Sequence, residues 1–378
     1  MSRIYLDHAA TTPLLAQAAE AMAAWSGKEF GNPSSLHAEG RAAKHAVDEA
    51  REVFSESLGC LFGEIVFTSS GTEAANLALV GAALGNENPA RNRILIGAAE
   101  HHCVLHTKPL LERLGYRVDL IPVNREALID LDWLSDQNPD DVLLVSVMHA
   151  NNEFGTLQPV AEVSGWARER GVLIHRDSVQ TFPGPWTVEE PFADLITVSA
   201  HKFNGPKGVG AAYVRAGTKV APTALGGGQE REMRAGTENV SGLVGAAAAL
   251  RWHTQNPALR VEKQAARDAF ASALSPDFQP TVQSAPSLGG HHHVRLPGVD
   301  AEIFLIRLDK AGVSASSGAA CSSGSLEPSH VMMASGFSET ESREGLRFTF
   351  GLGVSVDDAQ KAAALVNETA AAILAHRR

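Results

Sequence analysis

Short apolar segments alternate with amphipathic ones through the first half of the chain, and this alternation constrains the fold most strongly. Such an order of strands and helices favours a mostly parallel sheet that is covered by helices on both faces. Ligands then gather at the carboxyl ends of the strands. We expect strands at residues 65–67, 93–97, 118–122, 142–148, 172–175, 195–198 and 209–214, and helices at 14–25, 36–58, 72–84, 102–114 and 160–170.

The pattern changes after Gly226, where a glycine-rich, charged loop covers residues 226–239. An alanine-rich helix is expected from about Ser241 to about Leu274, followed by strands near Val294 and at 346–350 and a last helix at 356–375. We predict a large domain at 14–255 and a smaller α+β domain formed by 1–13 and 256–378, with the N-terminal strand folding back onto it. The smaller domain carries a loop at about 315–328.

Composition excludes several classes of protein. Basic residues number 32 and acidic residues 43, a net charge of −11, which gives no reason to expect nucleic-acid or anionic-membrane binding. No apolar segment is long enough to cross a bilayer, and the N-terminus lacks a signal-peptide pattern, so a cytoplasmic location is expected. The three cysteines form neither a disulfide framework nor a C-x-x-C metal site, and no metal is predicted.

Lys202 lies where a predicted buried strand ends abruptly, in Ser199-Ala200-His201-Lys202. There its ammonium group loses hydration, so we expect a lowered pKa and more neutral amine. A neutral amine can form a Schiff base with an aldehyde cofactor, and pyridoxal phosphate is the usual one. The alternative is a lysine that reaches solvent from a strand end. Lys207 lies among turn residues and is expected to be solvated.

A predicted anion site follows the strand at 65–67, in Thr68-Ser69-Ser70-Gly71-Thr72-Glu73. The first backbone N–H groups of the next helix have no intrahelical partner, and the helix dipole favours an anion there. That setting suits a cofactor phosphate, with Ser199 and His201 as further donors. The alternative is a plain helix N-cap formed by Ser70 or Thr72.

Two further strand ends carry groups that suit a planar cofactor. In Glu100-His101-His102 an imidazole can stack on a ring and move protons, although a partly exposed histidine pair explains it equally well. Asp177 ends a short apolar strand, and its buried carboxylate requires a positive partner such as a protonated pyridine nitrogen. Gln180 can reach the phenolic oxygen of the ring. The alternative role for Asp177 is a helix N-cap.

Two residues outside the predicted main sheet complete the candidate site. Cys321 lies among small residues, with glycine on both sides, as expected for a nucleophile on a mobile loop or for an inert thiol. Arg347 lies inside an apolar strand pattern and must be paired, either with a substrate carboxylate or in an internal salt bridge. Cys60 and Cys103 have apolar neighbours and are interpreted as core residues.

These segments, in this order, resemble the cysteine desulfurases, the NifS/IscS-like branch of pyridoxal-phosphate enzymes with the aspartate aminotransferase fold (fold type I). The cysteine loop is similar to that of the family's first group, not to the R-x-G-x-x-C form of the second. The resemblance implies a mostly parallel seven-stranded sheet in the large domain. The matching stretches span nearly the whole chain: YLDHAATTP, FGNPSS, FTSSGTEAANLAL, AEHH, HANNEFGTLQP, Asp177-x-x-Gln180, SAHKFNGPKGVGA, GGGQEREMRAGTEN, SSGAACSSGSLEPS and LRFTFG.

The resemblance also implies a role for each position. Lys202 would carry the cofactor and remove the α-proton of L-cysteine, and Cys321 would take the sulfur as a persulfide and pass it to an acceptor such as an iron–sulfur scaffold protein. His101 would stack on the ring and shuttle protons. The other implied contacts are Asp177 and Gln180 to the ring, Gly71, Thr72, Ser199 and His201 to the phosphate, Thr237 to the phosphate from the partner subunit of a homodimer, and Asn32, Asn152 and Arg347 to the substrate carboxylate.

The sequence departs from the commoner family pattern at His8, at Arg176 and Ser178, at residues 182–186 and at Gly289-Gly290-His291-His292-His293. We interpret the three histidines as a solvated strand end, because adjacent strand residues point to opposite faces and do not favour a metal site. The alternative functions are a selenocysteine lyase or aminotransferase on the same fold, or a non-catalytic scaffold protein. Alanine release with sulfane sulfur distinguishes the desulfurase from an aminotransferase.

Overall fold

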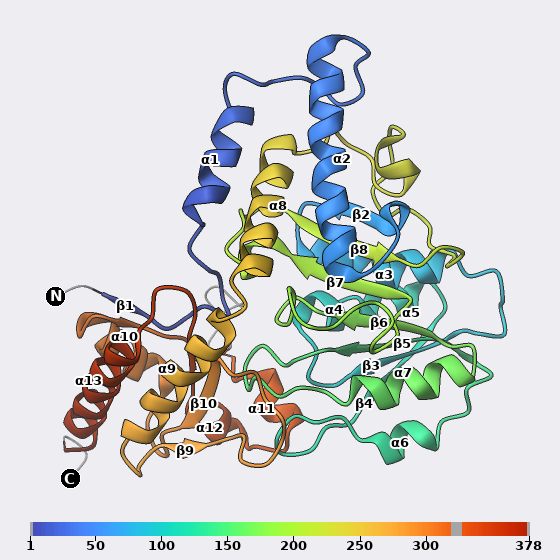
Figure 1. Ribbon diagram of the computed structural model, residues 1–378. Helices are drawn as coiled ribbons and strands as arrows, with labels where there is room; N and C mark the ends of the chain where they lie inside the picture. Colours follow the sequence, from blue (N-terminus) through green and yellow to red (C-terminus); the bar gives the residue numbers. More distant parts are fainter. Residues whose placement is uncertain (1–2, 319–326, 376–378) are drawn as a thin grey trace.

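The computed structural model describes residues 3–318 and 327–375 (Figure 1). Its largest sheet has seven strands in the order β2-β8-β7-β6-β5-β3-β4, and only β8 runs antiparallel to its neighbours. The predicted α/β fold with a mostly parallel seven-stranded sheet is therefore confirmed. The strands are β2 (Ile65–Thr68), β3 (Arg93–Gly97), β4 (Arg117–Ile121), β5 (Val142–Met148), β6 (Leu173–Asp177), β7 (Leu195–Ser199) and β8 (Gly210–Val214).

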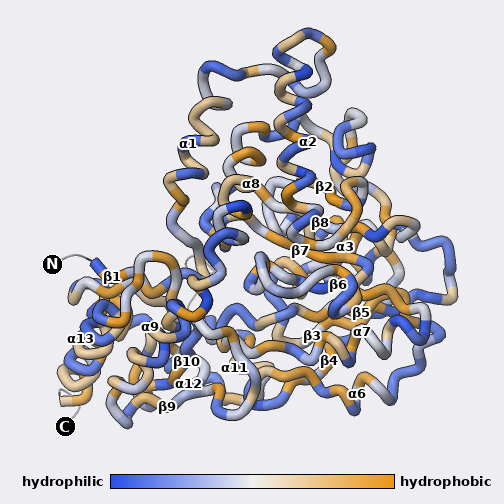
Figure 2. The backbone as a smooth tube through the Cα atoms, viewed as in Figure 1, coloured by the Kyte–Doolittle hydropathy of each residue, from blue (hydrophilic) through white to orange (hydrophobic). Residues whose placement is uncertain are grey.

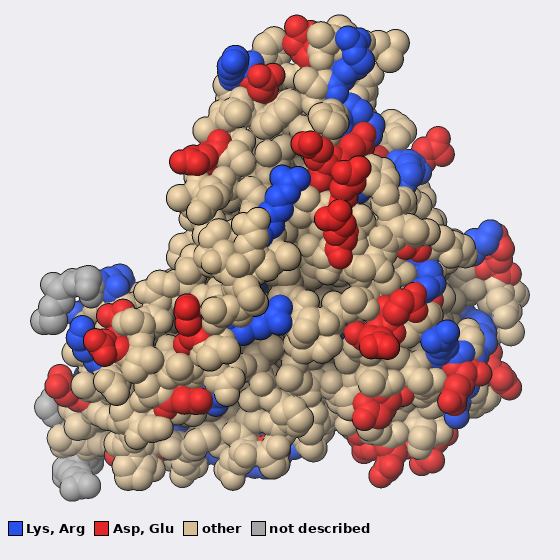
Figure 3. Space-filling view, viewed as in Figure 1, with Lys and Arg blue, Asp and Glu red and all other residues tan. Residues whose placement is uncertain are grey.

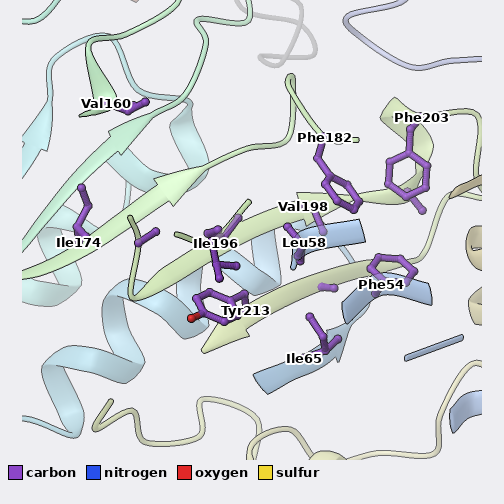
Figure 4. Close-up of a cluster of buried hydrophobic side chains, with 14 of the residues drawn as sticks. Phe54, Leu58, Ile65, Val160, Ile174, Phe182, Ile196, Val198, Phe203 and Tyr213 are labelled. Atoms are coloured by element: carbon purple, nitrogen blue, oxygen red, sulfur yellow. The ribbon is translucent and has the colours of Figure 1, made fainter. Parts of the chain in front are cut away.

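Helices cover both faces of this sheet because successive strand residues point to opposite sides. On one face the buried cluster includes Phe54, Ile65 and Tyr213 (Figure 4). Its helices are α1 (Ala16–Trp25), α2 (Ala38–Leu58), α6 (Leu131–Ser135), α7 (Val160–Glu169) and α8 (Val240–Gln255). The other face packs against α3 (Gly71–Leu84), α4 (His102–Leu105) and α5 (Lys108–Arg113). Hydrophobic residues follow the strands and the inner sides of the helices (Figure 2).

Two smaller sheets lie beside the large one and have a separate hydrophobic cluster. The three-stranded sheet has the order β12-β10-β9, and the short N-terminal strand β1 pairs with β11. Both ends of the chain lie in this part of the molecule (Figure 1). The elements are β1 (Ile4–Tyr5), α9 (Leu259–Ala273), β9 (Gln279–Pro280), β10 (His291–Arg295), α10 (Ala301–Lys310), β11 (Val313–Ser314), α11 (His330–Ala334), α12 (Glu339–Ser342), β12 (Gly345–Thr349) and α13 (Val356–Ala375).

Two helices expected to be continuous are each divided. Residues 102–114 form α4 and α5, and Pro109 lies in the first turn of α5, where its missing N–H group is tolerated. Residues 241–274 form α8 and α9, which are separated at Asn256-Pro257-Ala258. Proline cannot donate the helical hydrogen bond, so the chain turns there and passes from the large sheet to the smaller ones.

The interpretation of the three histidines as a solvated strand end is wrong. They lie on β10, which pairs with β12 on one side and β9 on the other, and His293 is only 2% exposed. Burial lowers the pKa of His291 and His293 to about 3 and that of His292 to about 4. His293 therefore belongs to the interior of this sheet as a neutral imidazole, whereas His291 and His292, at the start of β10, are half-buried.

The two cysteines interpreted as core residues are only partly buried. Cys60 packs against the edge of one hydrophobic cluster, and Cys103 packs against another. Within residues 3–318 and 327–375, every helix is too short or too polar to cross a membrane.

Candidate active site

Lys202 lies in a 3₁₀-helical turn (Ala200–Lys202) that follows β7 directly. The chain reverses there and returns as β8, so the side chain leaves the sheet at its carboxyl edge. The Lys202 Nζ atom donates hydrogen bonds to the carbonyl oxygens of Ala9 (2.5 Å) and Ala10 (2.9 Å). These carbonyl oxygens accept hydrogen bonds from the ammonium group without contributing a negative charge. As expected, Lys207 is exposed.

Asp177 ends β6, the neighbour of β7, and its side chain is buried. Its Oδ1 atom accepts a hydrogen bond from the Val179 backbone N–H (2.9 Å). Burial raises the pKa of Asp177 to about 6, although the Val179 hydrogen bond and the charge of Lys202 oppose this shift. Gln180 donates through Nε2 to the Ala9 carbonyl (3.1 Å), which Lys202 also contacts. Asp177, Gln180 and Lys202 therefore meet at the N-terminal segment.

His101 follows β3 and begins α4 as its N-cap residue. Its Nδ1 atom accepts a hydrogen bond from the Cys103 backbone N–H (3.1 Å). Burial, followed by the nearby charge of Lys202, lowers the pKa of His101 to about 4. The imidazole is therefore neutral near neutral pH and can accept a proton.

Glu100 is a buried carboxyl group that the sequence analysis did not identify. Its Oε1 atom accepts a hydrogen bond from the backbone N–H of Met148, the last residue of β5. Burial, followed by the charge of Asp177, raises the pKa of Glu100 well above its ordinary value. The signal in the sequence is the acidic residue of the stretch AEHH, directly before the two histidines.

The predicted anion site lies at the start of α3, beside the end of β7. The Ser70 side chain caps the helix by accepting from the Glu73 backbone N–H (3.1 Å), so the N-cap alternative is present. A Cβ atom at Gly71 would lie 3.2 Å from the Ser199 Cβ, and glycine therefore allows the helix start and the strand end to approach. His201 contacts the Thr11 hydroxyl through Nδ1 (3.1 Å).

Arg347 and Asn152 are adjacent on the side of the small sheet. The Arg347 Nη2 atom forms a salt bridge with Asp7 (2.8 Å), and Nη1 donates to the Asn152 carbonyl (2.9 Å). The internal salt-bridge alternative is therefore also present. Within the described residues, the buried Arg347 Nε and Asn152 Oδ1 atoms have no hydrogen-bond partner. The Arg347 Nε–H group can donate to a carboxylate oxygen, whereas the Asn152 Oδ1 atom can only accept, for example from an ammonium group.

Three predicted site residues are not brought to this cluster. Asn32 is exposed in the loop between α1 and α2, at the end of α2 that lies away from the sheet (Figure 1). Thr237 is exposed in the loop before α8. Cys321 lies outside the described residues.

The cluster fits the chemistry of pyridoxal phosphate. Asp177 is a buried carboxylate of raised pKa, a suitable partner for a protonated ring nitrogen. Lys202 supplies a primary amine at the adjacent strand end, and the first turn of α3 supplies backbone donors for a phosphate. Among residues 3–318 and 327–375, there is no group of three His, Cys, Asp or Glu side chains able to hold a metal ion.

Comparison with known proteins supports the same chemistry. The model of the class-V aminotransferase family matches residues 4–361. The cysteine desulfurase IscS of Dictyoglomus turgidum is 42% identical over 94% of this chain and 91% of its own length. A solved NifS-like protein superposes with a TM-score of 0.91 at 31% identity, covering 99% of this chain and all of the other. The structure of SspA in complex with cysteine has a TM-score of 0.82 at 31% identity, covering 92% of this chain and 99% of the other.

Proposed function

This chain belongs to the class-V aminotransferase family and is a pyridoxal-phosphate-dependent cysteine desulfurase, and on that premise we propose how its residues divide the reaction. Lys202, Asp177, Gln180 and His101 would hold the cofactor and move protons, while Cys321 would receive the sulfur of L-cysteine. The meeting of Lys202 and Gln180 at one carbonyl, with Asp177 on the adjacent strand end, carries this proposal.

Each cofactor contact has a physical reason in this proposal. Lys202 would bind the aldehyde carbon covalently, and Asp177 would hold the protonated ring nitrogen. Gln180 would reach the ring oxygen, and Gly71, Thr72, Ser199 and His201 would surround the phosphate. When bound, pyridoxal phosphate withdraws electrons from the substrate α-carbon and so makes its proton removable.

The substrate contacts follow from the unpaired atoms on the side of the small sheet. Arg347 would bind the substrate carboxylate, and Asn152 would orient the substrate. Asn32 lies away from both residues in the single chain, so no contact is assigned to it here. Lys202 would then accept the α-proton, and the neutral His101 imidazole would accept the proton of the substrate thiol.

The sulfur transfer is a displacement at the substrate sulfur. The Cys321 thiolate would attack this sulfur, so that an S–S bond forms while the bond between the sulfur and the substrate Cβ breaks. Cys321 would be left as a persulfide, and the remaining three-carbon fragment would gain protons to leave as L-alanine. The reactive form of Cys321 is the thiolate. Cys321 must also remain reduced before the reaction, which suits a reducing, cytoplasmic compartment.

We also assign the partners by this proposal. A homodimer would bring the exposed Thr237 of each subunit to the phosphate of the other, where the single chain supplies no such contact from it among its described residues. The sulfur would pass to an acceptor protein, either a scaffold for iron–sulfur cluster assembly or a protein of tRNA thiolation.

The decisive experiment locates the sulfur. The holoenzyme is incubated with L-cysteine without reductant, and the mass of each cysteine-containing peptide is measured. We expect one added sulfur on Cys321, and none on Cys60 or Cys103. The Cys321→Ser variant should bind cysteine without releasing alanine, whereas the matched Cys103→Ser variant should turn over normally. Multiple turnovers by Cys321→Ser would refute the nucleophile assignment.

A further inference from the structure

A cavity of about 630 Å³ lies next to Lys202. Lys202 and Gln180 line it, whereas Asp177, His101 and Thr72 do not. Its walls come from the N-terminal segment, the chain after β6, the start of α9 and the segment before β10. Small-molecule sites typically have volumes of about 300–1,000 Å³, so this cavity has the size of a metabolite site.

The charged side chains that line the cavity favour an anion. The lining contains three basic side chains, those of Lys202, Arg260 and Lys263. It contains one carboxylate, that of the exposed Glu56. Figure 3 shows basic side chains over the start of α9, in the middle of this face. Lys263 is partly buried and forms no ion pair within the described residues, and burial followed by the charge of Arg260 lowers its pKa. A bound anion would remove this repulsion between like charges.

Two imidazoles add hydrogen-bonding atoms that have no protein partner. His8 is 7% exposed, and its Nδ1 atom lies 3.1 Å from the Thr349 carbonyl oxygen. Because a carbonyl only accepts, Nδ1 carries the hydrogen, and burial keeps the ring neutral by lowering its pKa. Nε2 is then an acceptor without a hydrogen-bond partner in the described part of the chain, and the same is true of His291 Nε2. These two nitrogen atoms are buried, so the imidazoles line the cavity as neutral groups and do not reach into it.

We propose that this cavity binds a compact organic oxyanion with at least two negative charges. The oxyanion groups lie against Lys263 and Arg260. Polycarboxylates and phosphate esters share this chemistry. The walls also include His8, residues 182–186 and Gly289 to His291, at which the sequence departs from the pattern of the family that it resembles.

Binding to the holoenzyme tests the site by isothermal titration calorimetry at constant ionic strength. Citrate represents the polycarboxylates, glycerol 3-phosphate represents the phosphate esters, and chloride is the control anion. The Arg260→Gln/Lys263→Gln variant removes both cations from one face of α9. The matched control is Arg307→Gln/Lys310→Gln, which has the same charge change and the same spacing on α10, at exposed positions outside the cavity.

We expect citrate or glycerol 3-phosphate to bind at one site and to bind at least about tenfold more weakly to Arg260→Gln/Lys263→Gln, while the α10 variant keeps the original Kd. Binding of citrate alone assigns a polycarboxylate, and binding of glycerol 3-phosphate alone assigns a phosphate ester. The proposal is overturned if neither binds up to about 10 mM, or if both variants weaken binding equally. Heat of binding needs no turnover, so either failure leaves the desulfurase assignment intact.

Discussion

Two regions of the large sheet bury charged side chains, and the two regions provide different partners for these side chains. Behind β2, Arg51 and Glu230 have side chains only 4% and 2% exposed and form two hydrogen bonds of 2.7 Å with each other. Glu230 also accepts from the Phe67 backbone N–H, and Arg51 donates to the Ile65 carbonyl. Every charge in this pair has an opposite charge in contact.

The carboxyl ends of β6 and β7 are arranged differently. Asp177 accepts a backbone hydrogen bond, and Lys202 donates to two carbonyl oxygens. Burial raises the pKa of Asp177 to about 6. The saturated pair behind β2 stabilises the fold, whereas the strand-end groups keep binding capacity for a ligand. The difference teaches that a buried carboxyl group of raised pKa marks the site better than burial alone.

The largest effect should come from removing the amine of the strand-end cluster. We expect Lys202→Ala to lose the visible absorbance of bound pyridoxal phosphate and to lower turnover by more than about 10³-fold, because both attachment and proton transfer disappear. The exposed Lys207→Ala is the matched control and should retain both properties. A Lys202→Ala protein that keeps its bound cofactor band would place the attachment on another lysine.

The next effect tests the saturated pair. Arg51→Met leaves Glu230 buried without its partner, and we expect the free energy of unfolding to fall by about 3–5 kcal/mol. Urea denaturation measures this change, and the activity per folded molecule should stay unchanged. The double variant Arg51→Met/Glu230→Met should recover part of the loss, because no lone charge remains. A larger loss of unfolding free energy in the double variant than in Arg51→Met would contradict the view that the two side chains mainly compensate each other's charge.

The sequence predicted the large sheet well because its signals are local. Apolar β-branched runs separated by helices were enough to place all of its strands within a few residues, and β3 and β5 at the residues observed. The predicted strand ends also contain Lys202, Asp177 and His101, which the structure brings to one edge. Asp177 ends β6, and Lys202 and His101 come within a few residues of the ends of β7 and β3, so the parallel order places them at the same edge.

The remaining features depend on contacts between distant parts of the chain. The histidines at the start of β10 pair with β12, which lies more than fifty residues later in the chain, and no local pattern shows this partner. Lys202 is held by the backbone carbonyls of Ala9 and Ala10, and backbone atoms leave no signal in the residue types. Arg51 and Glu230 are likewise far apart in sequence, and only the folded chain joins them.

Glu153 provides an intermediate case, because its buried carboxyl group contacts the neutral Ser329 hydroxyl. Burial raises its pKa from 4.5 in the unfolded chain to about 7 in the folded protein. Between these values the folded state binds more protons, so its stability falls as the pH rises from about 4.5 to about 7. Relative to Glu153→Gln, the wild-type protein should lose about 2–3 kcal/mol across this window.

Urea denaturation at several pH values measures this difference, and subtraction of the variant removes the contribution of the buried histidines. Those groups have lowered pKa values, such as about 3 for His175, and they destabilise the protein in the opposite direction, as the pH falls below 6.5. The exposed Glu20→Gln is the control and should follow the wild-type profile. A difference profile that is flat between these pH values would mean that Glu153 is already fully compensated in the folded protein.

The smallest effect has the opposite sign. In the cofactor-free protein, the ionised Asp177 is disfavoured near neutral pH, because its folded-state pKa of about 6 lies above its ordinary 3.8. Asp177→Asn removes the charge and can still accept from the Val179 N–H. We therefore expect the free energy of unfolding of the cofactor-free protein to rise by about 1–2 kcal/mol while turnover falls. If Asp177→Asn instead destabilises the protein as Arg51→Met does, the strand-end carboxylate is a structural group, and the contrast between the two regions fails.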